Sequence, residues 1–158
     1  MGKLYDYVGP EEKRASASPT RCCIDSAEAL QDWMRLQPAR GDSIPATFIV
    51  DETGRLWLAD RRSEHVACAA GRPVLGAGEL FFDLTTAPRV AEASNQSTGY
   101  CPEPESWSAL AAALDRLGIP HPGGFTQVCH FRRCSACGQR NIVKEADSTC
   151  AVCGAELP

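Results

Sequence analysis

The stretch Cys134-Ser135-Ala136-Cys137-Gly138 returns in the same form as Cys150-Ala151-Val152-Cys153-Gly154, and twelve residues separate Cys137 from Cys150. Two cysteines with two residues between them can turn both sulfurs toward one point only if the backbone turns tightly, and the glycine after each pair supplies the freedom for that turn. Four thiolates from two such turns complete a closed tetrahedral sphere. The repeat therefore predicts a structural Zn²⁺ site with the ligands Cys134, Cys137, Cys150 and Cys153.

These four cysteines, together with Gly138 and Gly154, resemble the zinc-ribbon family over roughly the last thirty residues. The resemblance implies a small fold of antiparallel β-strands clamped by zinc. A disulfide framework is the alternative use of the cysteines, but paired turns that end in glycine favour a metal. Cys129 and His130 stand close enough to compete for the ion, although four well-spaced cysteines already fill the sphere. We recognise no family resemblance in the rest of the chain.

The composition fits one main globular domain with a small appendage, since 44% of the 158 residues are hydrophobic and 23% are charged. Nine cysteines would indicate disulfides in a secreted protein, but residues 1–7 lack the apolar run of a signal peptide. We therefore expect a cytoplasmic protein. No stretch approaches the roughly twenty apolar residues that a membrane span needs. The net charge of -4 argues against a chain-wide surface for nucleic acid.

The chain divides into three expected segments: a loosely ordered N-terminal arm over residues 1–20, a globular domain over 21–128 and the ribbon over 129–158. Two amphipathic helices are predicted in the domain. The first begins near the capping pair Asp25 and Glu28 and ends before Pro38, and the second covers 107–117 and ends at Gly118.

Runs of β-branched and aromatic residues predict strands over 44–50, 55–59, 65–70, 79–84, 89–93 and 125–131. Most of them follow one another through short turns without an intervening helix, which favours an antiparallel meander with one face covered by the two helices. The predicted fold class is therefore α+β, a largely antiparallel sheet with two covering helices and a C-terminal zinc ribbon.

The polar stretch 94–101 lies between a predicted strand and a predicted helix, where backbone N–H groups bind anions readily. Its residue types are also ordinary loop formers, so a plain loop is the alternative. If arginine side chains lie close to this loop, they would bind a carboxylate or a phosphate there. The first hypothesis is a recognition module that holds a partner protein or a small polar or anionic ligand. Its candidate ligand-binding residues are Arg61, Arg62, Asn95, Gln96, Ser97, Thr98 and Tyr100.

A second hypothesis is a small cysteine-dependent enzyme. Cys101 directly precedes Pro102 near a helix start, where the helix dipole favours a thiolate, and His65 or His121 would serve as its base. Nothing in the sequence shows that these residues meet. The chain has no nucleophile elbow, phosphate-binding loop, dinucleotide fingerprint or HExxH pattern.

A nucleic-acid-binding zinc ribbon is the third hypothesis. Arg132, Arg133, Arg140 and Lys144 give the C-terminal segment positive charge, but three acidic residues nearly cancel it: Glu145, Asp147 and Glu156. No aromatic residues alternate with the basic ones to stack bases. Nucleic acid is therefore the least favoured partner.

Overall fold

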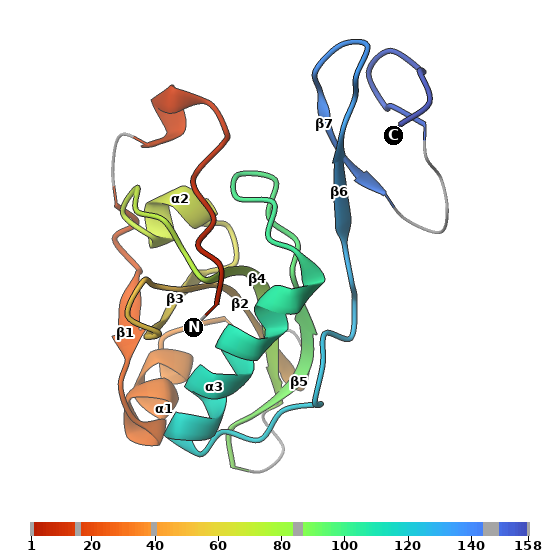
Figure 1. Ribbon diagram of the computed structural model, residues 1–158. Coiled ribbons are helices and arrows are strands. Elements are labelled where there is room, and N and C mark those ends of the chain that lie inside the picture. The colour runs from red at the N-terminus through yellow and green to blue at the C-terminus, as the bar shows by residue number, and fades with distance from the viewer. Residues whose placement is uncertain (1, 15–16, 39–40, 84–86, 144–148, 158) are drawn as a thin grey trace.

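An antiparallel sheet forms the centre of the computed structural model, which describes residues 2–14, 17–38, 41–83, 87–143 and 149–157. Within these residues the sheet has five strands in the order β1-β3-β2-β4-β5, all paired antiparallel (Figure 1). The strands are β1 (Cys22–Ile24), β2 (Ser43–Val50), β3 (Leu56–Asp60), β4 (Gly76–Asp83) and β5 (Arg89–Ser94). The antiparallel sheet is as predicted, while β1 is an additional edge strand. Leu84, expected at the end of a strand, lies outside the described residues.

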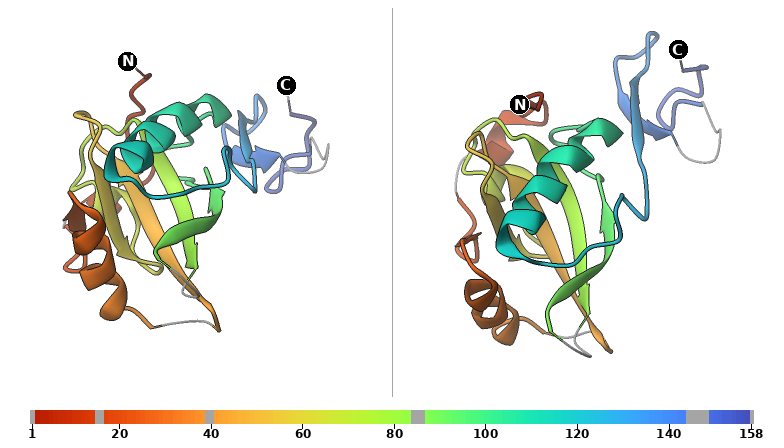
Figure 2. Two further views of the ribbon diagram at one scale, coloured as in Figure 1. Left: turned by 90° about the horizontal axis from the view of Figure 1, so that it is seen from below. Right: turned by 60° about the horizontal axis from the view of Figure 1, so that its bottom comes forward.

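Two helices cover one face of the sheet, as the sequence predicts (Figure 2). Helix α1 (Ala27–Arg35) is capped by Ser26, whose Oγ accepts a hydrogen bond from the N–H of Ala29 at 3.0 Å. Helix α3 (Trp107–Leu117) ends at Gly118, which adopts φ 71°. Together they bury an apolar core against the strands, with Leu30, Phe48, Leu58, Leu80, Phe82, Leu110 and Leu114 fully enclosed.

The predicted strand over 65–70 is wrong, because the short helix α2 (His65–Cys68) occupies this stretch. Strands β3 and β4 both lie antiparallel to β2, so they run parallel to each other on either side of it. Parallel strands need a crossover instead of a hairpin, and α2 makes that crossover. The sheet is therefore not a simple meander. One turn of helix is too short for its apolar period to show in the sequence.

The opposite face of the sheet is covered by α2 and by the N-terminal residues. Tyr5 pairs with Val74 through two backbone hydrogen bonds of 2.7 and 3.0 Å. The ring of Tyr7 lies 5.7 Å from that of Tyr100, centroid to centroid. Residues expected to form a loosely ordered arm thus contribute two buried tyrosines to a second core. The alternation of buried Tyr5 and Tyr7 with exposed neighbours has the period of a strand.

The ribbon follows the domain without a separate linker. The N–H groups of Thr126 and Gln127 both donate to the carbonyl of Ala93, at 2.9 and 3.1 Å, which attaches the incoming chain to the end of β5. The ribbon strands are β6 (His130–Arg133) and β7 (Arg140–Val143). The strand predicted over 125–131 therefore begins later, at His130. No helix in the described part of the chain is long and apolar enough to cross a membrane.

A glycine in β4 fixes the path of the chain beyond β5. A Cβ atom added at Gly78 would overlap the carbonyl oxygen of Ser94 and would lie 3.0 Å from the Cα of Asn95. Only a residue without a side chain lets the backbone of residues 94–95 lie this close to β4. The start of the 94–101 loop is thus held against the sheet by direct backbone contact.

We expect the substitution Gly78→Ala to lower the free energy of unfolding by about 2 kcal/mol or more, because the added methyl group meets backbone that cannot move aside. Urea denaturation followed by circular dichroism measures the change. Gly124→Ala is the matched control, since nothing lies within 4 Å of a Cβ at that position. Equal stability of the two variants would contradict this account of the loop.

Candidate metal centre

Each CxxCG stretch forms the same closed turn. The N–H of Cys134 donates to the carbonyl of Gln139 at 2.8 Å, and the N–H of Gly138 donates back to the carbonyl of Cys134 at 2.9 Å. The second turn repeats both bonds, from Cys150 to Ala155 at 2.8 Å and from Gly154 to Cys150 at 2.9 Å. Both glycines have positive φ, 79° at Gly138 and 77° at Gly154, as the sequence predicts.

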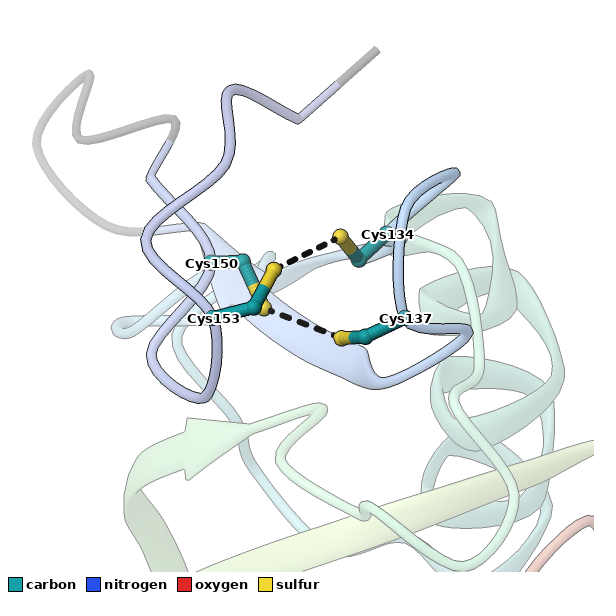
Figure 3. Close-up of side chains that lie close together, drawn as sticks. All are labelled: Cys134, Cys137, Cys150 and Cys153. Atoms are coloured by element: carbon teal, nitrogen blue, oxygen red, sulfur yellow. Dashed lines mark hydrogen bonds between the residues drawn. The ribbon is translucent and has the colours of Figure 1, made fainter.

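The two turns bring four sulfurs to one point (Figure 3). The Sγ atoms of Cys134, Cys137, Cys150 and Cys153 all lie within 4.8 Å of one another. Two pairs, Cys134 with Cys153 and Cys137 with Cys150, are separated by 3.6 Å. Disulfide sulfurs are about 2.05 Å apart. A Zn–S bond of about 2.3 Å puts the sulfurs of a regular tetrahedron about 3.8 Å apart. The residues therefore fit a tetrahedral metal ion, and the cluster contains neither Cys129 nor His130.

The backbone favours the charged form of two of these cysteines. The N–H of Cys153 is the largest influence on Cys150 and lowers the pKa of that thiol to about 6. The N–H of Cys137 likewise lowers the pKa of Cys134. The pKa of Cys137 rises to about 12, because desolvation and the neighbouring sulfurs outweigh the favourable N–H of Gln139. Four thiolates in this space repel one another, and a divalent cation removes that repulsion.

Asn141 joins the two turns and is a residue that the sequence analysis missed. Its side chain is 7% exposed and comes from β7. The amide Nδ2 donates to the carbonyl of Gln139 at 3.0 Å and to the sulfur of Cys150 at 3.5 Å, while Oδ1 accepts from the N–H of Ala151 at 2.9 Å. Asn141 therefore fixes one turn against the other and orients the sulfur of Cys150, a candidate metal ligand. The only feature of the sequence that could have indicated Asn141 is its position as a single amide residue in a short strand close after the first turn.

The polar side chains of the 94–101 loop mostly bind within the protein. Asn95 is fully buried, donates to the carbonyls of Pro102 and Cys129 at 3.0 and 2.9 Å, and accepts from the N–H of Cys129 at 2.7 Å. Ser97 Oγ accepts from the N–H of Tyr100 at 3.3 Å. These contacts hold the loop in shape. Gln96 is half-buried and Thr98 is exposed.

Two further candidate ligand-binding residues, Arg61 and Arg62, lie in the exposed turn after β3. Among the described residues, neither side chain forms a hydrogen bond or an ion pair with the 94–101 loop. The Tyr100 hydroxyl donates to the carbonyl of Arg72 at 2.8 Å, so this candidate also has an internal partner. A role in binding stays a prediction for all of these residues.

The structure does not join Cys101 to a histidine within the described residues. The Cys101 thiol donates to the carbonyl of Thr98 at 3.4 Å, and burial raises the pKa of Cys101. His65 donates from Nε2 to the carbonyl of Gly78 at 2.8 Å, and His121 Nε2 lies 2.8 Å from Asp115 Oδ1. A nucleophile needs a base within hydrogen-bonding distance or a lowered pKa. Cys101 has neither.

The basic residues of the ribbon are described only in part. Arg132, Arg133 and Arg140 lie on β6 and β7 and are exposed. Lys144, Glu145 and Asp147 lie outside the described residues. The charge balance of the third hypothesis therefore stays a prediction.

We expect the substitution Asn141→Ala to weaken metal binding by about tenfold to a hundredfold, the usual cost of losing a residue that supports a ligand. Competition with a chromophoric chelator measures the affinity. Ser135→Ala lies inside the first turn but removes no hydrogen bond made to a described residue, so it serves as the control. The role of Asn141 would be refuted if both variants bound the metal as the parent does.

Alkylation by iodoacetamide tests the state of Cys101. Because burial raises its pKa, the alkylation rate of the metal-loaded protein should still be rising above pH 9.0, the ordinary value for a thiol. Peptide mass spectrometry reports each cysteine separately. Fast alkylation of Cys101 below neutral pH would move the enzyme hypothesis ahead of the recognition hypothesis.

No protein-family model matches this chain. Comparison with curated proteins and with solved structures also gives no significant match. The arrangement of the residues themselves is therefore the basis for a functional proposal.

Proposed function

We propose that the chain is a zinc-binding recognition module. A structural Zn²⁺ ion held by the four cysteines folds the ribbon, and the domain holds a partner protein or a polar ligand at the 94–101 loop. The observation that carries the proposal is the convergence of four sulfurs from two matching turns within 4.8 Å.

The donor set favours zinc. Tetrahedral sites with four thiolates suit Zn²⁺ or iron, and both prefer soft sulfur ligands. Four protein ligands leave no open position for water or substrate, which is typical of a structural site. The ion therefore holds the two turns together through its coordination bonds and takes no part in a reaction.

The small size of the ribbon core supports a structural role for the metal. Within the described residues its buried apolar cluster consists of Cys134, Cys150 and Leu157, with Val143 and Ala155 packed against it. So few residues cannot offset the conformational entropy that the ribbon loses on folding. In small metal domains the binding free energy of the ion is folding free energy.

The shape of the loop supports recognition over catalysis. Asn95, Ser97 and Tyr100 fix its backbone, so a ligand at its exposed side would meet an ordered surface and lose little affinity to loop ordering. Thr98 is exposed at the tip of this ordered segment. The same loop offers no activated nucleophile at Cys101.

Substitution of the ligands tests the structural zinc. The purified chain should contain one zinc per molecule by elemental mass spectrometry, and Cys134→Ser or Cys150→Ser should lose the metal and unfold the ribbon. Nuclear magnetic resonance should show the ribbon signals collapsing while those of the domain persist, because the domain has its own core.

Cys23→Ser is the control, since Cys23 lies on β1 outside the cluster. Full zinc content and an unchanged ribbon in the Cys134→Ser variant would refute the ligand assignment. Iron in place of zinc in the purified parent would refute the choice of metal.

A further inference from the structure

Two adjoining cavities lie between the domain and the ribbon. One, of about 430 Å³, is bordered by the N-terminal residues, the end of the 94–101 loop and β6. The other, of about 590 Å³, is bordered by residues 8–10, Thr98 and residues on both sides of the first cysteine turn. Val8 and Arg140 line both cavities. We call the two cavities together the ribbon groove. In Figure 1 the two strands of the ribbon stand beside the turn that follows β5.

The ribbon side of the groove places two arginines in an unfavourable arrangement. Arg133 and Arg140 are direct partners in the β6–β7 ladder, so their side chains project from the same face. Like charges directly opposite each other destabilise a strand pair. Neither guanidinium forms an ion pair with a described residue, and both line the larger cavity. An anion bound between the two guanidinium groups would attract both and offset the repulsion between them.

The two ends of the groove differ in charge. At the larger cavity Arg133 and Arg140 are the charged residues. The smaller cavity is lined by Arg132 and Arg140 but also contains two carboxylates, that of Asp6 and that of Glu103, which forms an ion pair of 2.9 Å with Lys3. A long polyanion such as a nucleic acid would bring phosphates against these carboxylates. A ligand with its acidic groups at one end avoids that repulsion.

Apolar side chains lie along the N-terminal border of the groove. Leu4 is 46% exposed and Val8 is 40% exposed, which makes them two of the few large apolar residues on the described surface. Half-buried Phe131 lines the same, smaller cavity. The groove therefore combines a cationic end with an apolar border, as surfaces that bind short peptide segments do.

We propose that the ribbon groove binds an acidic segment of a partner protein, with carboxylates against Arg133 and Arg140 and an apolar side chain against Leu4 and Val8. The inference rests on the recognition role proposed above and gives that role a site and a ligand class. Arginine suits this task because its planar guanidinium binds a carboxylate through two parallel hydrogen bonds. Thr98, Tyr100 and Cys101 border the groove, so the loop contributes part of its wall.

Display of an unbiased library of short peptides on the zinc-loaded full chain tests the ligand class. Selection should enrich peptides that contain Asp or Glu together with an aliphatic residue. Their binding should weaken as salt is added, and in each selected peptide the change of Glu to Gln should lower the affinity. Chemical-shift changes should centre on residues 98–101, 131–133 and 140.

Substitution of the arginines tests the site. Arg133→Gln or Arg140→Gln should lower the affinity for the selected peptides by about tenfold or more, because each substitution removes a charge-assisted contact. Arg35→Gln is the matched control, since Arg35 lies on α1 and pairs with Asp32 at 2.9 Å. Without peptide, Arg140→Gln should leave the ribbon at least as stable as in the parent, because it removes a like-charge pair. A purely structural role for Arg140 would give the opposite change.

Four results would overturn the inference. Selected peptides that contact residues 94–101 but are not acidic, or that bind the Arg140→Gln variant as tightly as the parent, would refute the site while the recognition role stands. A failure to select any peptide on a chain that holds its zinc would refute the peptide site and would leave a polar ligand at the 94–101 loop as the form of recognition. If single-stranded DNA binds more tightly than the peptides, with the same dependence on Arg133 and Arg140, the ligand of the groove is a nucleic acid and not a peptide.

Discussion

The convergence of four cysteine sulfurs determines the C-terminal part of this protein. Two turns with the same hydrogen bonds bring the sulfurs within 4.8 Å, and Asn141 ties one turn to the other. Without a cation the arrangement concentrates negative charge beside a core of only a few apolar residues. A coordinated ion would give the ribbon the stability that the five-stranded sheet obtains from its own two apolar cores.

The link between the two parts of the chain depends on buried backbone contacts. Gly78 lets the backbone at Ser94 lie against β4, and Asn95 then binds both Pro102 and Cys129. The oxygen and nitrogen of an amide side chain can form hydrogen bonds either with a ligand or with the backbone of the same protein. In this structure the Asn95 amide forms its hydrogen bonds with the backbone. The polar loop is consequently an ordered support on which only a few groups, such as Thr98, face outward.

Local sequence signals predicted much of this structure. Gly118 after α3 and the glycines that end the paired CxxCG stretches, Gly138 and Gly154, each specify a backbone conformation within a few residues, and all three have positive φ. Contacts between distant residues were not predictable in this way. The crossover through α2, the burial of Tyr5 and Tyr7 and the clamp by Asn141 each depend on a partner far away in the sequence or on strand order. Periodicity carries no information about such partners.

If the chain has the function proposed above, the first cysteine turn would couple metal binding to recognition. Arg133 directly precedes Cys134, and Arg140 follows the turn that Gly138 closes, so the turn sets the separation of the two guanidinium groups. The ribbon core is too small to hold two arginines opposite each other unless another interaction keeps the strands paired. Four metal–sulfur bonds at the end of the same ladder can supply that interaction. On this proposal the metal would offset the repulsion between Arg133 and Arg140 in the free protein, and an acidic ligand would remove it on binding. A surface ordered by the metal in this way would be lost with the metal, while the sheet and its helices would keep their own cores.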